Sequence, residues 1–500
     1  MQPELKPPPQ KYSALVIISA VATALLAIAG LTWLGKYLSG NKVVEEQPNS
    51  ITQKNIATKT NNTEALYALQ DGQSLTLPGT KVTAKELKAN PVPYIPGKAS
   101  KLTTEELTVA KTAWKYFEHN WNDETGLVNS ADKFPSVTLW DQSAAIAALV
   151  STKELKIIEE QEFKTKLDKM LGTLAKLELY NEELPNKVYN AKTLIPVNYG
   201  GLEKAETIGW SAIDLGRMAI WLKIIGAKYP QYKNQADAVW QAWDIERLVK
   251  DGDMYGTSIV AGEEQYNQEG RLGYENYAAF GLKLWGLKVN KALDYEDKTA
   301  FVDLYDVGIP YDLRDAQNSG ANNYVLSEPY FLDGIETGFQ ALPKAYSDRI
   351  FKAQEARYQN TKQLTAITED NLDRDPRFVY NTLYVNGKPW STITDTGENY
   401  NHLRFLSTKA AIGWHVLYDN EYTQKLFDFV VANLESETGW YNGYYETLQE
   451  PNDALTANNN GVILESLLYK QIGKPLIVWA GVKTESETSR SLNKKSEGND

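Results

Sequence analysis

Two stretches of the chain, far apart in sequence, have nearly the same pattern. Residues 120–130 read NWNDETGLVNS and residues 433–443 read NLESETGWYNG. They share a first asparagine, Glu-Thr-Gly in the middle and a second asparagine, with a register of 313 residues. Thr-Gly is common turn chemistry after a helix, so two unrelated turns would also explain the pair. The other explanation is a fold that closes on itself and brings both stretches together.

Apolar residues recur at helical spacing throughout residues 101–482, which predicts about twelve helices. The links that follow the even-numbered helices are short, as at Ala227–Pro230 and Tyr418–Glu421. Most links that follow the odd-numbered helices are long, as at residues 251–271 and 363–399, and loops of that length are usually functional. If consecutive helices are antiparallel, every long loop lies on one face. The predicted helices are residues 103–119, 139–152, 160–178, 208–226, 231–249, 272–288, 294–303, 329–340, 344–361, 400–418, 422–434 and 456–471.

The even-numbered helices differ in composition from the odd-numbered ones. Stretches such as DQSAAIAALV and NYAAFGLKLWG are rich in small residues, which permit close helix packing and suit an inner ring. Odd-numbered stretches such as residues 162–180 are amphipathic, with one face for solvent. Strand-like alternation is sparse, apart from a predicted hairpin at Phe378–Gly387. The pattern predicts an all-α fold, an (α/α)6 toroid of six helical hairpins, in which the first and last hairpins are neighbours.

The composition excludes several kinds of partner and site. The net charge of −12 argues against nucleic acid, because binding to phosphates requires a basic surface. The chain has no cysteine, so disulfides and thiolate metal sites are excluded, and its three scattered histidines do not suggest a zinc site. We therefore expect no metal and no cofactor. The 13 tryptophans and 30 tyrosines suit both a large core and a surface that stacks on sugar rings.

The N-terminal part of the chain predicts its location. Residues 14–34, ALVIISAVATALLAIAGLTWL, carry no charge and are long enough to cross a hydrocarbon core of about 30 Å. The apolar region of a signal peptide is usually roughly 7–15 residues long, so we expect an uncleaved transmembrane anchor in the inner (plasma) membrane. Residues 1–13 are then cytoplasmic and the folded domain is periplasmic or extracellular. Residues 35–100 are typical of a low-complexity tether, and residues 483–500 of a disordered polar tail.

Several longer segments resemble a known bacterial family. The similarity extends over most of residues 101–477, and only the combination of segments is specific. The family is the domain of unknown function 3131, which is grouped by fold with six-hairpin glycosidases, including glucoamylase-like enzymes. The resemblance implies the toroid and, by analogy of fold alone, a role with glycans. The segments are residues 113–149, 209–224 (GWSAIDLGRMAIWLKI), 273–286 (GYENYAAFGLKLWG), 327–338 (SEPYFLDGIETG) and 364–390.

Hydrolysis of a glycosidic bond requires one protonated and one ionised carboxyl group beside that bond. The resemblance to glucoamylase-like enzymes implies an acid in the loop between helices five and six and a base in the loop between helices eleven and twelve. Glu275 and Glu446 are the catalytic candidates by position, and both lie among aromatic residues. Burial against tyrosines would raise the pKa of Glu275, as an acid requires. The structural alternative for Glu275 is a carboxylate that stabilises a helix N-terminus.

Candidate substrate-binding residues lie on the same predicted face. Aromatic rings stack on the faces of sugars, and carboxylates accept hydrogen bonds from sugar hydroxyls. Each candidate also has a structural explanation as a helix cap, a turn residue or a part of the core. The candidates are Asp141, Trp140, Trp210, Tyr274, Glu328, Asp333, Glu336 and Trp440.

Together these features predict a membrane-anchored glycoside hydrolase that acts on a cell-envelope or extracellular polysaccharide by an inverting, two-carboxylate mechanism. Two alternatives remain open. A non-catalytic glycan-binding toroid would hold its carboxylates far apart. A polysaccharide lyase would need Tyr or His beside Arg or Lys, for which Arg271 and His402 are available, although the acidic face disfavours a uronate polymer.

Overall fold

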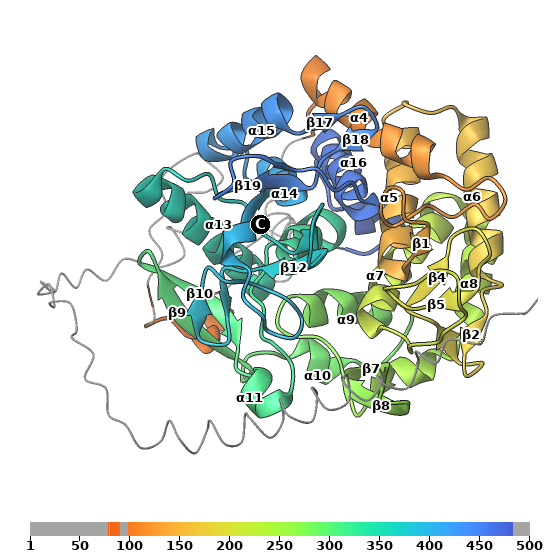
Figure 1. Ribbon diagram of the computed structural model, residues 1–500, viewed down its shortest axis with the longest axis horizontal. Coiled ribbons are helices and arrows are strands. Elements are labelled where there is room, and N and C mark those ends of the chain that lie inside the picture. The colour runs from red at the N-terminus through yellow and green to blue at the C-terminus, as the bar shows by residue number, and fades with distance from the viewer. Residues whose placement is uncertain (1–78, 80, 91–98, 340, 484–500) are drawn as a thin grey trace, which may run out of the picture. The chain divides into compact units, whose positions relative to one another are not determined.

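Six helices form a closed inner ring in the described part of the chain (Figure 1). The computed structural model of the protein describes residues 79, 81–90, 99–339 and 341–483. Each inner helix packs against the next one, and the last packs against the first. The ring consists of α5 (Leu139–Glu154), α7 (Ala212–Lys228), α9 (Tyr274–Leu284), α12 (Glu328–Leu332) with its π-helical continuation η4 (Asp333–Thr337), α14 (Thr408–Tyr418) and α16 (Ala457–Ile472).

Six outer helices precede the inner ones in alternation and pack around the ring. The described residues therefore form the predicted arrangement of six helical hairpins. None of the helices among these residues is long and apolar enough to cross a membrane. The outer helices are α4 (Thr104–Asn120), α6 (Glu160–Leu174), α8 (Lys233–Gln241), α10 (Asn290–Leu293), α13 (Ala341–Thr361) and α15 (Glu421–Asn433), and two further short helices are α3 (Ala84–Ala89) and α11 (Ala316–Ser319).

Small residues allow the inner helices to pack closely. A Cβ added to Gly281 of α9 would lie 2.0 Å from the carbonyl oxygen of Gly216 in α7. A Cβ added to Gly461 of α16 would lie 2.7 Å from the carbonyl oxygen of Ala144 in α5. Contacts this short are not tolerated, so these helix pairs depend on glycine. The prediction that the Ala- and Gly-rich helices form the inner ring is confirmed.

The long loops carry short antiparallel strands at the N-terminal ends of the inner helices. Strands from different loops pair with each other, which places the long loops on one face, as predicted. The three-stranded sheets are β1 (Ser136–Val137) with β4 (Val188–Asn190) and β5 (Pro196–Val197), β6 (Val249–Lys250) with β7 (Asp253–Val260) and β8 (Glu263–Gln268), β11 (Asp370–Asn371) with β12 (Phe378–Asn381) and β15 (Thr392–Ile393), and β16 (Phe405–Ser407) with β19 (Gly443–Tyr445) and β20 (Pro451–Asn452). The two-stranded pairs are β2 (Leu179–Tyr180) with β3 (Leu184–Pro185), β9 (Thr299–Leu304) with β10 (Val307–Asp312), β13 (Tyr384–Val385) with β14 (Lys388–Pro389), and β17 (Glu435–Ser436) with β18 (Gly439–Trp440).

The two similar stretches at residues 120–130 and 433–443 both lie next to α4. The first follows α4 directly, and the hydroxyl of Tyr116 in α4 donates to the backbone oxygen of Asn129 at 2.7 Å. The second packs on the same helix, because the indole N–H of Trp440 donates to the backbone oxygen of Val109 at 3.0 Å. Closure of the ring therefore makes the two stretches neighbours, as predicted.

One predicted helix is a strand in the structure, and the predicted membrane anchor lies outside the described residues. The predicted helix at residues 294–303 is wrong, because Thr299–Leu304 pairs as a strand with Val307–Asp312. The two residues between these strands, Tyr305 and Asp306, have φ values of 53° and 63°, as a tight hairpin turn requires. The predicted anchor at residues 14–34 lies outside the described residues and stays a prediction.

Candidate active site

Two inner helices begin with the same short motif, which places a carboxylate at the loop face. Thr138 caps α5 and Ser211 caps α7, and each hydroxyl accepts the backbone N–H of the aspartate three residues later. These aspartates are Asp141 and Asp214, and both are half-buried. The motif folds this way because a Ser or Thr side chain satisfies a free N–H in the first helical turn. An acidic residue in that turn also interacts favourably with the helix dipole.

Asp214 shares its capping hydroxyl with a second carboxylate. The hydroxyl of Ser211 lies 2.8 Å from Oε1 of Glu269 and 3.2 Å from Oδ1 of Asp214. Oε2 of Glu269 accepts the backbone N–H of Ala212 at 2.6 Å. Glu269 follows strand β8, and an added Cβ at Gly256 of β7 would lie 2.3 Å from its Oε2. Glycine at position 256 therefore leaves the space that the Glu269 carboxylate occupies.

Burial raises the pKa of both carboxyl groups. Burial raises the pKa of Asp214 to about 7, and the negative charges of Glu269 and Asp141 contribute to the rise. Burial also raises the pKa of Glu269, while Lys187, Ser211 and the N–H groups of α7 act in the opposite direction. A pKa of about 7 means that Asp214 can hold or release a proton near neutral pH.

Tyr199 lies near Asp214 and Glu269. The residue is 62% exposed, while burial of its hydroxyl end and the charges of Asp214 and Glu269 raise its pKa. It follows strand β5 and precedes two glycines, Gly200 and Gly201. An exposed ring beside paired carboxyl groups is suited to stacking on a sugar while the carboxyl groups act on it.

A second group of carboxyls comes from the loop between α13 and α14. Burial raises the pKa values of Glu369 and Asp370 to about 7, although the ammonium of Lys409 lowers both. Tyr274 donates a short hydrogen bond to Oε1 of Glu369. Lys409 is itself paired with Glu328, with 2.6 Å between Nζ and Oε2. Among the described residues, no set of three or more such side chains is arranged to hold a metal ion.

Several aromatic rings lie beside these carboxyl groups. The rings of Tyr324 and Tyr380 stack with their centroids 3.7 Å apart. Burial raises the pKa of Tyr380, and so do the charges of Tyr324, Glu369 and Tyr199, so this phenol lies near both Glu369 and Tyr199. Trp140 packs edge-to-face on Tyr274 at 5.3 Å. The rings and carboxyls together have the composition of a sugar-binding cleft.

A charged network is buried beneath the site. The guanidinium of Arg217 donates to Asn458 at 2.7 Å and to Glu465 at 2.8 Å, and its Nε lies 3.4 Å from Glu336. It also stacks on the ring of Trp140, 4.6 Å from the ring centroid. All three charged side chains are fully buried. Burial and the charge of Glu336 raise the pKa of Glu465, while the charge of Arg217 lowers it.

The two predicted catalytic residues are held by arginines. Glu275 is fully buried and lies 2.5 Å from Arg314 and 3.6 Å from Lys298. Burial raises its pKa, although Arg314 and Lys298 favour its ionised form. Glu446 accepts two hydrogen bonds from Arg357, at 2.6 and 2.8 Å. This geometry gives each carboxylate a structural partner, so the roles assigned to Glu275 and Glu446 stay predictions and other residues fit the chemistry better.

The predicted substrate-binding residues fall into two classes. Trp140, Asp141 and Tyr274 are partly exposed beside the carboxyl groups described above. Trp210 and Trp440 are 0% and 1% exposed, so neither offers a ring face to a ligand. The prediction that these two rings stack on sugars is therefore wrong. Both sequence positions are aromatic because they fill the core. The remaining three are Glu328 and Glu336, which are fully buried in the ion pairs above, and Asp333, which bonds to Thr337 one turn later.

The residues that the sequence reading missed are Asp214, Glu269, Glu369, Asp370 and Tyr199. A signal for Asp214 was available, because SAID at residues 211–214 repeats the pattern of TLWD at residues 138–141. Glu269 stands in the loop just before the helix whose first turn contains Glu275, in a polar stretch that resembles an ordinary turn. The exposed Tyr199 and the paired Glu369 and Asp370 have no local pattern that separates them from other loop residues.

Comparisons with known proteins agree with this fold. A candidate glucoamylase from Bacteroides caccae superposes with a TM-score of 0.53 at 14% identity, covering 75% of this chain and 97% of that one. An endo-beta-1,2-glucanase from Chitinophaga pinensis superposes with a TM-score of 0.53 at 12% identity, covering 76% and 97%. At such identities the likeness shows the fold alone. No curated protein matches the chain. The sequence profile of the family described as "Protein of unknown function (DUF3131)" matches residues 108–473, so the chain belongs to that family.

Proposed function

We propose that the protein is a glycoside hydrolase that cleaves a polysaccharide at the loop-face site of Tyr199, Asp214, Glu269 and Glu369. The observation that carries the proposal is the pair Asp214–Glu269, which lies at the loop face of a six-hairpin fold. Among the described residues, neither carboxylate forms an ion pair. Both are therefore free to exchange protons with a substrate, unlike Glu275 and Glu446.

The chemistry follows from the environments of the carboxyl groups. Asp214 holds a proton near neutral pH and gives it to the glycosidic oxygen as the bond to the anomeric carbon breaks. Glu269 stays ionised because Ala212 and Ser211 donate to it, and its charge keeps the proton on Asp214. Glu369 removes a proton from the attacking water, and we place it across the aromatic rings from Asp214. Attack from the opposite side inverts the anomeric carbon.

The choice of substrate class rests on the aromatic rings and on charge. Tyr199, Tyr274 and Trp140 offer ring faces and edges that suit the apolar faces of sugars. The cations near the site are opposed by carboxylates: Lys409 and Arg217 form ion pairs, and Lys187 acts on Glu269, which disfavours an anionic sugar. A neutral polysaccharide fits best. Structural neighbours include beta-1,2-glucanases, so beta-1,2-glucan is the first substrate to test, within the broader class of cell-envelope and extracellular polysaccharides.

Hydrolysis by the full chain tests the proposal. The protein would be purified in a detergent without a sugar headgroup and incubated with beta-1,2-, beta-1,3-, beta-1,4- and alpha-1,4-glucans and with amino-sugar polymers. We expect new reducing ends from at least one neutral polymer. Asp214→Asn provides the inactive control, because asparagine has nearly the same shape and no acidic proton. Binding without cleavage by the wild-type protein would favour the alternative of a glycan-binding toroid.

We further propose that residues 14–34 anchor the enzyme in the inner membrane, with the toroid outside the cytoplasm. The length and uncharged composition of this segment support the anchor. Protease added to spheroplasts should then digest the toroid while a cytoplasmic marker survives. A toroid that resists protease until the membrane is lysed would contradict this orientation, and a mature N-terminus after residue 34 would contradict the anchor.

A further inference from the structure

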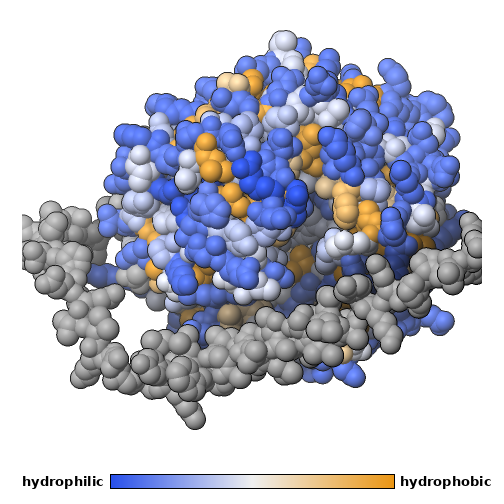
Figure 2. Space-filling view, viewed as in Figure 1, coloured by the Kyte–Doolittle hydropathy of each residue, from blue (hydrophilic) through white to orange (hydrophobic). Residues whose placement is uncertain are grey.

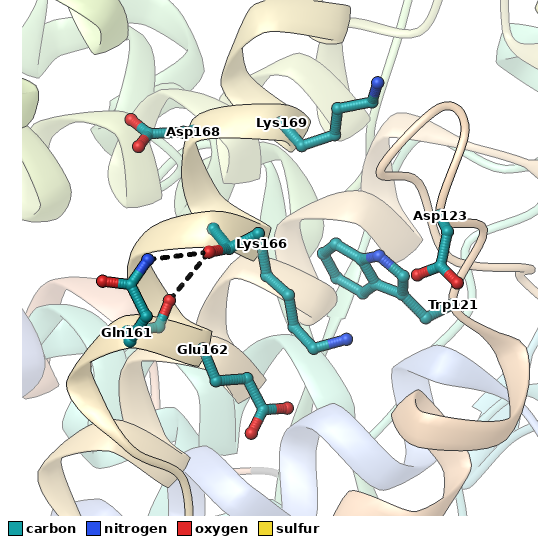
Figure 3. Close-up of a pocket in the computed structure, with 8 residues that line it drawn as sticks. Trp121, Asp123, Gln161, Glu162, Lys166, Asp168 and Lys169 are labelled. Carbon is teal, nitrogen blue, oxygen red and sulfur yellow. Dashed lines mark hydrogen bonds between the residues drawn. The ribbon is translucent and has the colours of Figure 1, made fainter.

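A groove of about 710 Å³ lies between the end of α4 and the helix α6 (Figure 3). It is separate from the carboxyl groups of the candidate active site, and none of those groups lines it. Its volume lies within the range of small-molecule sites, which is roughly 300–1,000 Å³. The groove is lined by Trp121, Asp123, Gln161, Glu162, Thr165, Lys166, Asp168 and Lys169.

Trp121 provides the aromatic surface of the groove. One part of the indole packs on the core, and the residue remains partly exposed. Figure 3 shows Lys166 reaching across the groove toward this ring, with its Nζ 4.2 Å from the ring centroid, and Asp123 beside the ring. Burial lowers the pKa of Lys166. Within the described residues, Lys166 forms no ion pair, so its long side chain is free to move off the ring.

The turn itself does not require a tryptophan at position 121. In the similar stretch at residues 433–443, the equivalent position is Leu434, which is fully buried. Leucine therefore supports the same turn when the position belongs to the core. The exposed tryptophan at position 121 is a difference between two copies of one pattern, and the core does not account for its exposed part.

We propose that this groove, which we call the Trp121 groove, is a second binding site for a neutral polysaccharide chain. The ring of Trp121 stacks on a sugar, and the nearby side chains of Asp123, Gln161 and Glu162 accept or donate hydrogen bonds to its hydroxyls. Three carboxylates and two ammonium groups line the groove, so its charge does not favour an anionic polysaccharide. The groove lies beside the start of the loop that ends at the cap of α5, and it extends along the outer helix α6.

The choice of a glycan rests on the proposed function, so the test separates the two. Full-length protein carrying Asp214→Asn, in a detergent without a sugar headgroup, would be run on native gels that contain beta-1,2-, beta-1,3-, beta-1,4- or alpha-1,4-glucan. We expect at least one glucan to retard it, and Trp121→Leu to weaken that binding by about tenfold. Trp479→Leu is the matched control, because the ring of Trp479 also lies under a lysine, Lys228, at 4.0 Å.

A readout on short substrates distinguishes this site from the active site. With Asp214 intact, Trp121→Leu should leave hydrolysis of short oligosaccharides unchanged and slow hydrolysis of the polymer. Equal retardation of the Trp121→Leu and Trp479→Leu variants would overturn the inference, as would no retardation by any of the glucans. Retardation that depends on Trp121 in a protein that hydrolyses nothing would support the groove and contradict the proposed function.

Discussion

Asp214→Asn is expected to lower kcat/KM on the polysaccharide substrate by about 10²–10⁴-fold, the usual contribution of a general acid. The amide cannot donate a proton to the leaving oxygen. The wild-type enzyme should lose activity above pH 7, because the pKa of Asp214 is about 7 and only its protonated form acts as the acid. The measurement is kcat/KM between pH 4 and 9, with circular dichroism to confirm that the variant is folded.

Glu269→Gln is the matched test of how this pKa is set. The negative charge of Glu269 helps to raise the pKa of Asp214, so its removal should move the basic limb of the pH profile to lower pH. Activity below that limb should persist. Complete loss of activity at every pH in Glu269→Gln, with activity retained in Asp214→Asn, would show that Glu269 and not Asp214 is the proton donor.

Arg217→Met is expected to destabilise the protein by about 3–5 kcal/mol, the cost of breaking a buried ion pair. The substitution leaves Glu336 and Glu465 fully buried without their cation. The loss should be larger at pH 8 than at pH 5, because burial raises the pKa of Glu465 and this carboxyl is more fully protonated at the lower pH. Urea unfolding followed by tryptophan fluorescence at the two pH values measures it.

Two further variants show whether the charges are the cause. Glu336→Gln and Glu465→Gln, added to Arg217→Met, should recover much of the lost stability because they remove the unpaired charges. Arg377→Met is the surface control, since Arg377 pairs with Asp375 while both are mostly exposed, and it should change stability by less than about 1 kcal/mol. A small effect of Arg217→Met at both pH values would mean that the buried carboxyls are neutral without the arginine.

The fold was predictable because it depends on patterns that persist along the chain. Helical spacing and small residues identified the inner ring, and the asymmetry of loop lengths identified the functional face. The predicted helix at residues 294–303 begins just after the short helix α10 and overlaps the first strand of the hairpin at Thr299–Asp312, and the hairpin was missed. Local periodicity does not reveal that Tyr305 and Asp306 adopt positive φ and reverse the chain.

The site was less predictable because its key property is that Asp214 and Glu269 form no ion pair among the described residues. Glu269 and Glu275 are acidic residues only six positions apart, and only the folded chain shows that Arg314 pairs with Glu275 and not with Glu269. Arg357, which pairs with Glu446, is 89 residues away in sequence. Similarly, Trp210 and Trp440 could not be separated from exposed aromatic residues by sequence, because their burial depends on helices from other hairpins.

Hydrolysis in H₂¹⁸O tests the central claim most directly. A glycoside hydrolase transfers water oxygen to the anomeric carbon, so we expect wild-type products whose new reducing ends are heavier by two mass units. Asp214→Asn should give no product, and finished product incubated in the same water corrects for spontaneous exchange at the reducing end. Unsaturated products without label would indicate a lyase, and unlabelled or absent products from every neutral polymer bound by the protein would contradict hydrolysis.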